Sequence, residues 1–306
     1  MIKAFIGSLL ILILALFGFA CAPSSKPVKP NEATHEIGQG KLITSEGYEF
    51  PYRFYPVAQK GPTVVYLPGM DGRAAYGGGK GVYALAPSLN TANFNLLGFN
   101  RADAKTSYAS RSVGVTFRHT VKRSKSGSVY FPSIDGKESA TDNIIRNEVS
   151  AIIEFVESAP THDPEKGIYL IGASHGSWVS LCTVHSFPDK IKGVVFLTPG
   201  FHKGYFSSEW QAKYPEQNII NYFKSLIRSF GGRPALAIGS KRDIIDRQES
   251  KDASALDGAR LLREELGPNV EVMEVSSSFH QGELIEGSEE VRKKIVTWLT
   301  VNAYGK

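Results

Sequence analysis

Short apolar runs alternate with amphipathic segments along most of this chain. Apolar runs of about 4–8 residues bounded by turn residues predict buried strands, and such runs cover Thr63–Leu67, Phe94–Phe99, Gly167–Ile171, Lys192–Leu197, Ala235–Gly239 and Val270–Val275. Apolar positions at helical spacing cover Ser139–Ser158, Ser177–Val184, Ser254–Leu266 and Ser288–Val301. Strands that alternate with helices favour a mostly parallel sheet covered on both faces, so we expect an α/β fold with its chemistry beyond the carboxyl ends of the strands.

Local signals set the limits of several elements. Lys41–Ile43 and Tyr48–Tyr55 predict an opening hairpin that turns at Glu46-Gly47. Ser254 and Asp257 have the spacing of a capping box at a helix start, and Gly267 is the predicted stop of the same helix.

The first apolar segment is continuous and differs from the rest. Lys3 precedes an apolar run of 17 residues from Ala4 to Ala20, the pattern of a secretory signal and shorter than the roughly 20 residues that span a bilayer. Its end, Gly18-Phe19-Ala20-Cys21, resembles a bacterial lipoprotein signal, in which the cysteine becomes the lipidated first residue. A plain cleaved signal and an uncleaved anchor are the alternatives.

This resemblance implies a division of the chain and a location. We expect residues 1–20 to be the signal peptide, 21–36 a Pro-rich tether and 37–306 the folded domain. Ala22, rather than Asp, follows Cys21, which by the same resemblance favours the outer membrane. The expected location is therefore the bacterial cell envelope, lipid-anchored at the periplasmic face of the outer membrane.

Composition excludes several classes of protein. The chain has 306 residues, of which 42% are hydrophobic and 21% charged, an ordinary globular composition. The net charge of +5 is mild and does not indicate a dedicated nucleic-acid binder. Two cysteines cannot form a disulfide framework.

A candidate nucleophile follows the predicted strand Gly167–Ile171. There the chain reads Gly172-Ala173-Ser174-His175-Gly176 and continues into a predicted helix, which gives G-x-S-x-G the strand–turn–helix context that it requires. The glycines allow a strained turn that presents the Ser174 hydroxyl, and the amide of His175 at the helix start can stabilise an oxyanion.

A serine nucleophile needs a base and a group that orients the base. The strand Ala235–Gly239 leads into Asp243, and Val270–Val275 leads into His280. The chain order Ser174, Asp243, His280 is that of α/β-hydrolases. Asp246 lies three residues beyond Asp243 and is the alternative acid.

A second oxyanion donor is expected after Thr63–Leu67, where Pro68-Gly69-Met70 places the backbone N–H of Met70 in the donor position.

The chain from about Lys41 to Ala303 resembles the α/β-hydrolase superfamily. The resemblance rests on this oxyanion segment, the nucleophile turn around Ser174 (the elbow), the loop with Asp243 (the acid loop) and the loop with His280 (the histidine loop). The resemblance implies an eight-strand, mostly parallel sheet and a Ser174–Asp243–His280 triad. The sequence has no Cys/His cluster that suggests zinc, so we expect no metal or cofactor. The resemblance does not identify a substrate.

Two insertions carry open interpretations. Residues 201–230 are rich in aromatic side chains and form either a small cap that lines an acyl pocket or a helix packed on the core. Residues 104–134 carry six basic side chains before the first acid and form either a solvated hairpin or a contact with anionic lipid or an acidic substrate.

The resulting hypothesis is a membrane-anchored serine hydrolase that acts on a small-molecule or lipid-like acyl substrate, most simply a carboxylesterase. A serine peptidase of the same fold is the alternative enzyme. A catalytically inactive α/β-hydrolase-fold protein that binds a partner or assembles the envelope is the alternative from another class.

Overall fold

An eight-stranded sheet organises the part of the chain that the computed structural model describes, which is residues 38–44, 47, 49–69, 72, 74, 81–101, 140–201, 216–243 and 254–305. The strands are β1 (Gly38–Ile43), β2 (Glu49–Tyr55), β3 (Thr63–Leu67), β4 (Asn95–Phe99), β5 (Ile168–Ala173), β6 (Ile191–Leu197), β7 (Ala235–Ser240) and β8 (Val270–Val275). Their order is β1-β2-β4-β3-β5-β6-β7-β8. The β1–β2 and β2–β4 pairs are antiparallel and all others are parallel, so the predicted mostly parallel sheet is confirmed.

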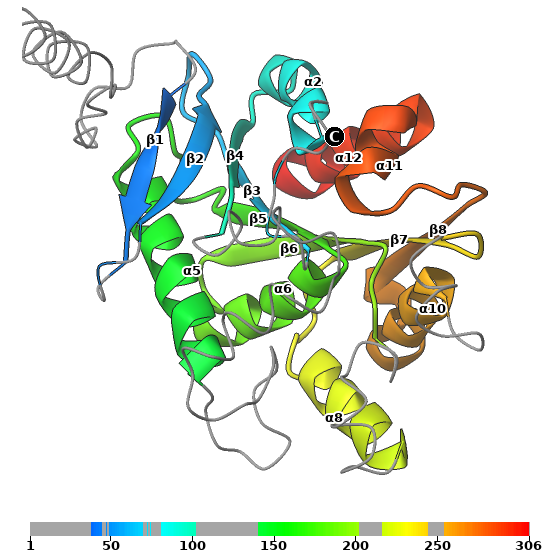
Figure 1. Ribbon diagram of the computed structural model, residues 1–306. Coiled ribbons are helices and arrows are strands. Elements are labelled where there is room, and N and C mark those ends of the chain that lie inside the picture. Colours follow the sequence, from blue (N-terminus) through cyan, green and yellow to red (C-terminus); the bar gives the residue numbers. More distant parts are fainter. Residues whose placement is uncertain are drawn as a thin grey trace, which may run out of the picture.

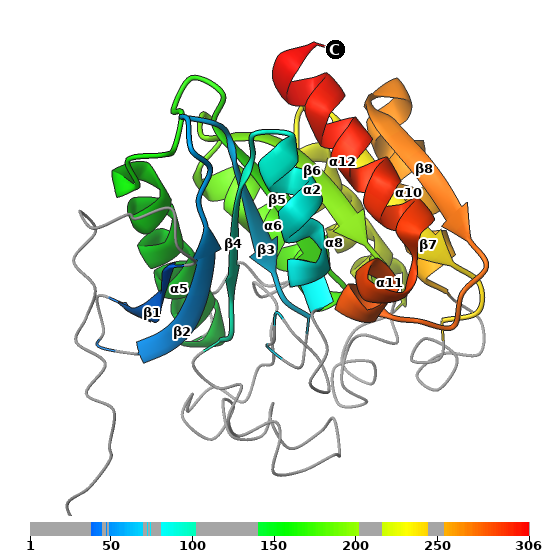
Figure 2. The ribbon, with the colours of Figure 1, turned by 90° about the horizontal axis from the view of Figure 1, so that it is seen from above.

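Helices cover both faces of this sheet (Figures 1 and 2). One face carries η1 (Gly81–Leu85), α2 (Ala86–Thr91), α11 (Gln281–Gly287) and α12 (Glu289–Tyr304). The other carries α5 (Ala140–Ser158), α6 (His175–Ser186), α8 (Glu216–Arg228) and α10 (Ala255–Leu266), after which the short η3 (Gly267–Asn269) leads into β8. The parallel strands therefore lie between two helical layers.

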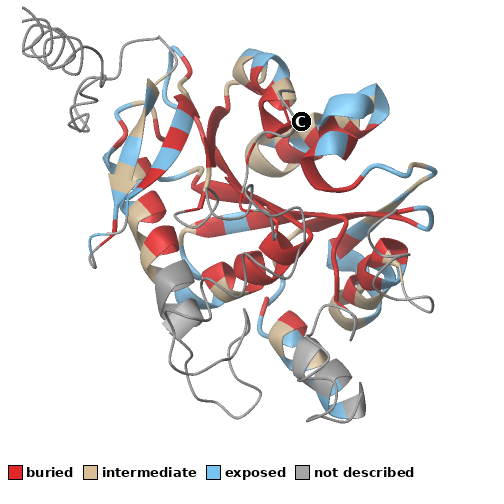
Figure 3. Ribbon diagram, viewed as in Figure 1, coloured by how far each residue is buried: buried red, intermediate tan, exposed pale blue. Residues whose placement is uncertain are grey.

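The core is divided by the sheet into two apolar clusters. In β3, Val64 and Tyr66 belong to the cluster under α2 and α12, whereas Val65 and Leu67 belong to the cluster under α5 and α6. Successive side chains of a strand point to opposite faces, so a strand buried on both sides is apolar throughout, and all five residues of β3 are buried. Figure 3 shows the central strands buried along their length.

Most predicted elements occur within one to three residues of their expected limits. β3 and β8 have the predicted bounds, and Ser254 and Asp257 form the predicted capping box of α10. The predicted start of α6 is wrong by two residues, because the helix begins at His175, directly after the turn. The sequence does not predict α2 and α11, since helices of 6 and 7 residues have too few turns to show apolar periodicity.

The region of the expected cap is described at Phe201, which is buried in the core, and from residue 216 onwards, as α8 and the turn after it. Ile227 and Phe230 are buried in the core beside α6 and α10. Glu265 of α10 pairs with Lys224 at 2.9 Å and with Arg228 at 2.8 Å. This end of the region packs on the core. Residues 202–215 lie outside the described residues, so the cap stays a prediction.

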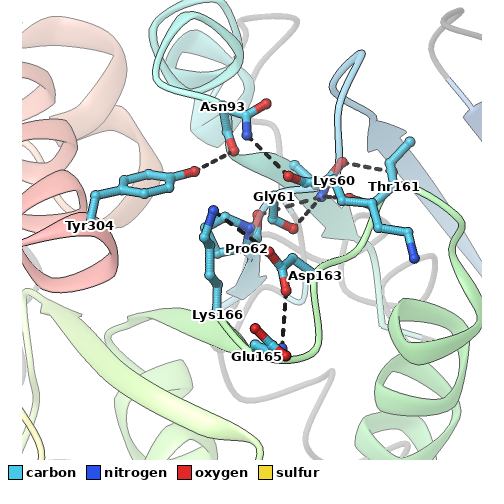
Figure 4. Close-up of polar contacts among 10 residues, drawn as sticks. Lys60, Gly61, Pro62, Asn93, Thr161, Asp163, Glu165, Lys166 and Tyr304 are labelled. Atoms are coloured by element: carbon cyan, nitrogen blue, oxygen red, sulfur yellow. Dashed lines mark hydrogen bonds and ion pairs between the residues drawn. The ribbon is translucent and has the colours of Figure 1, made fainter.

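Hydrogen bonds connect the segments that precede β3, β4 and β5, at the edge of the sheet where the parallel strands begin (Figure 4). The N–H of Gly61, before β3, donates to Thr161 O at 3.0 Å, and Asp163 N–H donates back to Gly61 O at 2.9 Å. On the α12 side, the Tyr304 hydroxyl donates to Asn93 O at 2.9 Å. These bonds fix β3, β4 and β5 relative to each other, and hence the loops at their opposite ends.

Candidate active site

Ser174 occupies a strained turn between β5 and α6. Its φ of 51° and ψ of −113° are unusual for a residue with a side chain and cost about 1–3 kcal/mol. The residue is 2% exposed. A serine held in this conformation is the geometry that the strand–turn–helix motif predicts for a nucleophile.

The two glycines of the motif permit this turn. A Cβ on Gly172 would lie 2.2 Å from Ser180 Oγ, and a Cβ on Gly176 would lie 2.0 Å from the backbone oxygen of Leu67. The second contact is with the end of β3, where the chain enters the segment predicted to hold the oxyanion. The glycines therefore bring the first turn of α6 directly against that segment.

The residues that directly follow β5 and β6 continue the backbone hydrogen bonding of the parallel sheet. Ser174 N–H donates to Leu197 O of β6 at 2.8 Å, and Thr198 N–H donates to Ile238 O of β7 at 2.8 Å. Thr198 also has a positive φ, 47°. These contacts fix the nucleophile turn relative to the carboxyl ends of β6 and β7.

The loops after β7 and β8 bring Asp243 and His280 together. His280 Nδ1 and Asp243 Oδ2 share a hydrogen bond, and the side chains are 4% and 0% exposed. A carboxylate can only accept, so the hydrogen bond to Asp243 requires that the neutral imidazole carries its proton on Nδ1. Nε2 is then the unprotonated nitrogen that can accept a proton. His280 Nε2 is buried and has no hydrogen bond within the described residues.

Ser240 links these two loops. Its hydroxyl donates to Ser277 O at 2.5 Å and accepts the N–H of Arg242 at 3.1 Å. The acid loop and the histidine loop are thus joined by hydrogen bonds three residues before Asp243 and three before His280, which limits their relative motion. The sequence analysis did not single out Ser240, and only its position at the end of β7 is a signal for it.

Residues that directly follow β4 hydrogen-bond the described part of the predicted oxyanion segment. Gly72 N–H donates to Gly69 O at 3.0 Å in a turn, and Gly72 O accepts the N–H of Arg101 at 2.8 Å. Asn100 Oδ1 accepts the N–H of Ala74 at 3.0 Å. Met70, the predicted donor, lies outside the described residues.

His175, the other predicted oxyanion donor, is the first residue of α6 and is 1% exposed. Its N–H belongs to the first turn, whose amides have no acceptor inside the helix. Among the further predictions, Asp246, Cys21 and the basic residues 104–134 lie outside the described residues.

The described residues contain no cluster of three or more His, Cys, Asp or Glu side chains arranged to hold a metal ion. No helix in the same part of the chain is both long and apolar enough to cross a membrane.

Solved structures of hydrolases have this arrangement of strands and helices. An esterase of Pyrococcus furiosus superposes with a TM-score of 0.52 at 18% identity, over 91% of this chain and 97% of its own. An esterase domain from a Rhodothermus marinus protein gives 0.55 at 13% identity, over 88% and 99%. A proline iminopeptidase of Mycobacterium smegmatis gives 0.54 at 9% identity, over 88% and 99%.

These likenesses establish the fold, which is the α/β-hydrolase fold that the sequence predicts. No protein-family model matches the chain, and no curated protein matches it at a significant level. Since one fold hosts many chemistries, the activity has to be argued from the site itself.

Proposed function

We propose that this protein is a serine hydrolase that cleaves carboxylic esters or related acyl bonds through an acyl-enzyme. The observation that carries the proposal is the buried hydrogen bond between Asp243 and His280, at the same edge of the sheet as the strained turn of Ser174. A nucleophile, a base and an orienting acid at the carboxyl ends of β5, β8 and β7 are the parts that this chemistry needs.

Each residue has a defined role in the proposed reaction. His280 Nε2 takes the hydroxyl proton as Ser174 Oγ attacks the acyl carbon, and the Met70 and His175 amides stabilise the developing oxyanion. The protonated His280 then gives its proton to the leaving alcohol, so the acyl group remains on Ser174. Water attacks this ester and loses a proton to His280, which gives that proton to Ser174 Oγ as the acid is released. Asp243 stabilises the imidazolium in both steps.

An ester substrate is the simplest choice, and two of the three similar structures above are named as esterases. The proline iminopeptidase keeps a peptidase as the second candidate. The two differ in the leaving group, an alcohol or an amine, and not in the residues of the proposed triad.

The test is labelling of the full-length chain, kept in detergent, with a fluorophosphonate probe that reacts with activated serines. Wild type is expected to label, and Ser174→Ala and His280→Ala are expected not to. Ser88→Ala, which changes an exposed serine of α2, is the matched control and should label like wild type. A folded wild type that does not label contradicts the proposal and favours the inactive binding protein. With labelling established, matched ester and aminoacyl amide substrates separate the two candidates.

We also propose that the protein is anchored through a lipid on Cys21. The support is the sequence pattern that ends in this cysteine, and Cys182 supplies a control. Metabolic labelling with an alkyne fatty acid should mark wild type and Cys182→Ala but not Cys21→Ala. Label that persists on Cys21→Ala contradicts this anchor and leaves the hydrolase proposal untouched.

A further inference from the structure

Gln281, the residue after His280, has an unusual backbone and a buried side chain. Its φ is 52°, in a region that side chains disfavour and glycine does not. It is 5% exposed, and its N–H donates to Thr198 Oγ1 at 3.3 Å. A glutamine held in this way requires compensating contacts.

Those contacts reach the start of the oxyanion segment. An added Cβ on Gly69 would lie 2.4 Å from each of Cδ, Nε2 and Oε1 of Gln281. The face of the Gln281 carboxamide therefore packs against the Gly69 backbone. It occupies the space that a side chain at position 69 would need. Gly69 directly precedes Met70, the expected oxyanion donor.

The helix that begins with Gln281 also contacts the chain just after residues 70–80. α11 packs against η1, and Glu286 Oε2 accepts the N–H of Gly81 at 3.0 Å. α11 thus contacts the chain on both sides of residues 70–80 while its N-cap is His280. One short helix therefore joins the base to the residues on either side of the predicted oxyanion donor.

We propose that Gln281 is a positioning residue for the reaction, which holds the Gly69 end of the oxyanion segment at a fixed place relative to His280. This inference rests on the proposed serine hydrolase. The carboxamide acts through the Gly69 backbone and not on the substrate. Its loss displaces the oxyanion donor, and a displacement of about 1 Å at a catalytic group can cost about 100-fold in rate.

Two substitutions remove the contact without adding backbone strain. Gln281→Asn keeps a carboxamide that is one methylene too short to cover Gly69, and Asn tolerates a positive φ. Gln281→Gly removes the side chain, and its backbone adopts this φ without strain. We expect kcat to fall about 10–100-fold and KM to stay within about threefold in both. The melting temperature of Gln281→Gly should stay close to that of wild type. The exposed Gln59→Ala is the control and should match wild type in every measurement.

A double-mutant cycle tests the contact itself. Gly69 has no positive φ, so Gly69→Ala acts through the collision of its Cβ with the carboxamide and should lower kcat by a similar factor. In the Gln281→Gly background the collision partner is absent, so Gly69→Ala should cost little more. The pH midpoint of kcat/KM should be the same in all variants, because the Asp243–His280 bond is unchanged.

The failure of this inference is distinguishable from the failure of the proposed function. If wild type neither labels with the fluorophosphonate nor turns over an ester, the hydrolase proposal fails and this inference fails with it. If wild type is active and both Gln281 variants keep its kcat, only the positioning role is overturned. A melting temperature that falls while kcat per folded molecule stays constant also overturns it, since Gln281 then only stabilises the fold.

Discussion

Asp243 and His280 share a buried hydrogen bond although 37 positions separate them in the chain. Neither residue is on a strand or inside a helix; each follows the end of a parallel strand, β7 or β8. Adjacent parallel strands end at the same edge, so two sequence-distant loops meet there. The bond holds the imidazole in the orientation and tautomer that a general base needs.

The first prediction concerns this bond. Asp243→Asn conserves the size of the side chain but removes the charge, and it favours the tautomer with the proton on Nε2. We expect kcat for an ester to fall by about 10⁴, as in other triads that lose the acid, with the melting temperature nearly unchanged. The exposed Asp189→Asn is the control. If Asp243→Asn retains activity and Asp246→Asn does not, the acid is Asp246 instead.

The second prediction concerns the close approach of α6 to β3. Gly176→Ala places a Cβ against the backbone oxygen of Leu67, which cannot move without shifting the strand. We expect the free energy of unfolding in urea to fall by about 1–3 kcal/mol and fluorophosphonate labelling to be lost. Gly232→Ala is the control, because a Cβ there meets no atom closer than 3.9 Å. Equal stability of the two variants would show that the elbow does not need this glycine.

The central part of the fold is predictable from the sequence because its signals are local. The apolar run Thr63–Leu67 predicts β3 with its observed bounds, and Ser254 predicts the start of α10. The strand-end positions of Ser174, Asp243 and His280 follow in the same way, since each comes shortly after a predicted strand. Their catalytic roles stay predictions until activity is measured.

What the sequence does not predict depends on contacts between distant segments. Gln281 has no sequence signal, because its importance lies in the space beside Gly69, 212 positions away. The short helix α11 is missed for a related reason: Leu284 and Ile285 are buried against η1, and tertiary packing rather than periodicity stabilises so short a helix.

The third prediction concerns pH and His162, which lies before β5 at the edge opposite the site. His162 Nδ1 hydrogen-bonds the Thr63 hydroxyl at 2.9 Å. Burial lowers the pKa of His162 below its usual 6.5, although Asp163 and Glu157 act in the opposite direction. Between the lowered folded pKa and 6.5 the unfolded chain binds more protons, so the free energy of unfolding falls as the pH drops through this window.

Urea unfolding between about pH 5 and 8 measures this effect. Wild type should lose stability below about pH 6.5, the usual pKa of histidine, and His162→Gln should lose less over the same interval. His185→Gln, which changes an exposed histidine of α6, should behave as wild type does. The same pH dependence in His162→Gln as in wild type would contradict this assignment.

The last prediction concerns a buried ion pair beside the oxyanion segment. Arg101 Nε lies 3.6 Å from Glu148 Oε2 of α5, with the two side chains 4% and 3% exposed. Removing one partner of a buried ion pair typically costs about 3–5 kcal/mol, whereas replacing both by apolar groups is often neutral. We therefore expect Glu148→Leu to destabilise strongly and Arg101→Met with Glu148→Leu to recover most of the loss.

The exposed pair of Lys41 and Glu49, at 2.7 Å, provides the control: Glu49→Gln should cost at most about 1 kcal/mol. The Arg101 backbone N–H, and not its side chain, holds Gly72 O. The double variant should therefore keep fluorophosphonate labelling as well as stability. Losses that simply add in the double variant would show that the two charges are not coupled. Recovered stability without labelling would instead show that the Arg101 side chain, in addition to its backbone, shapes the oxyanion segment.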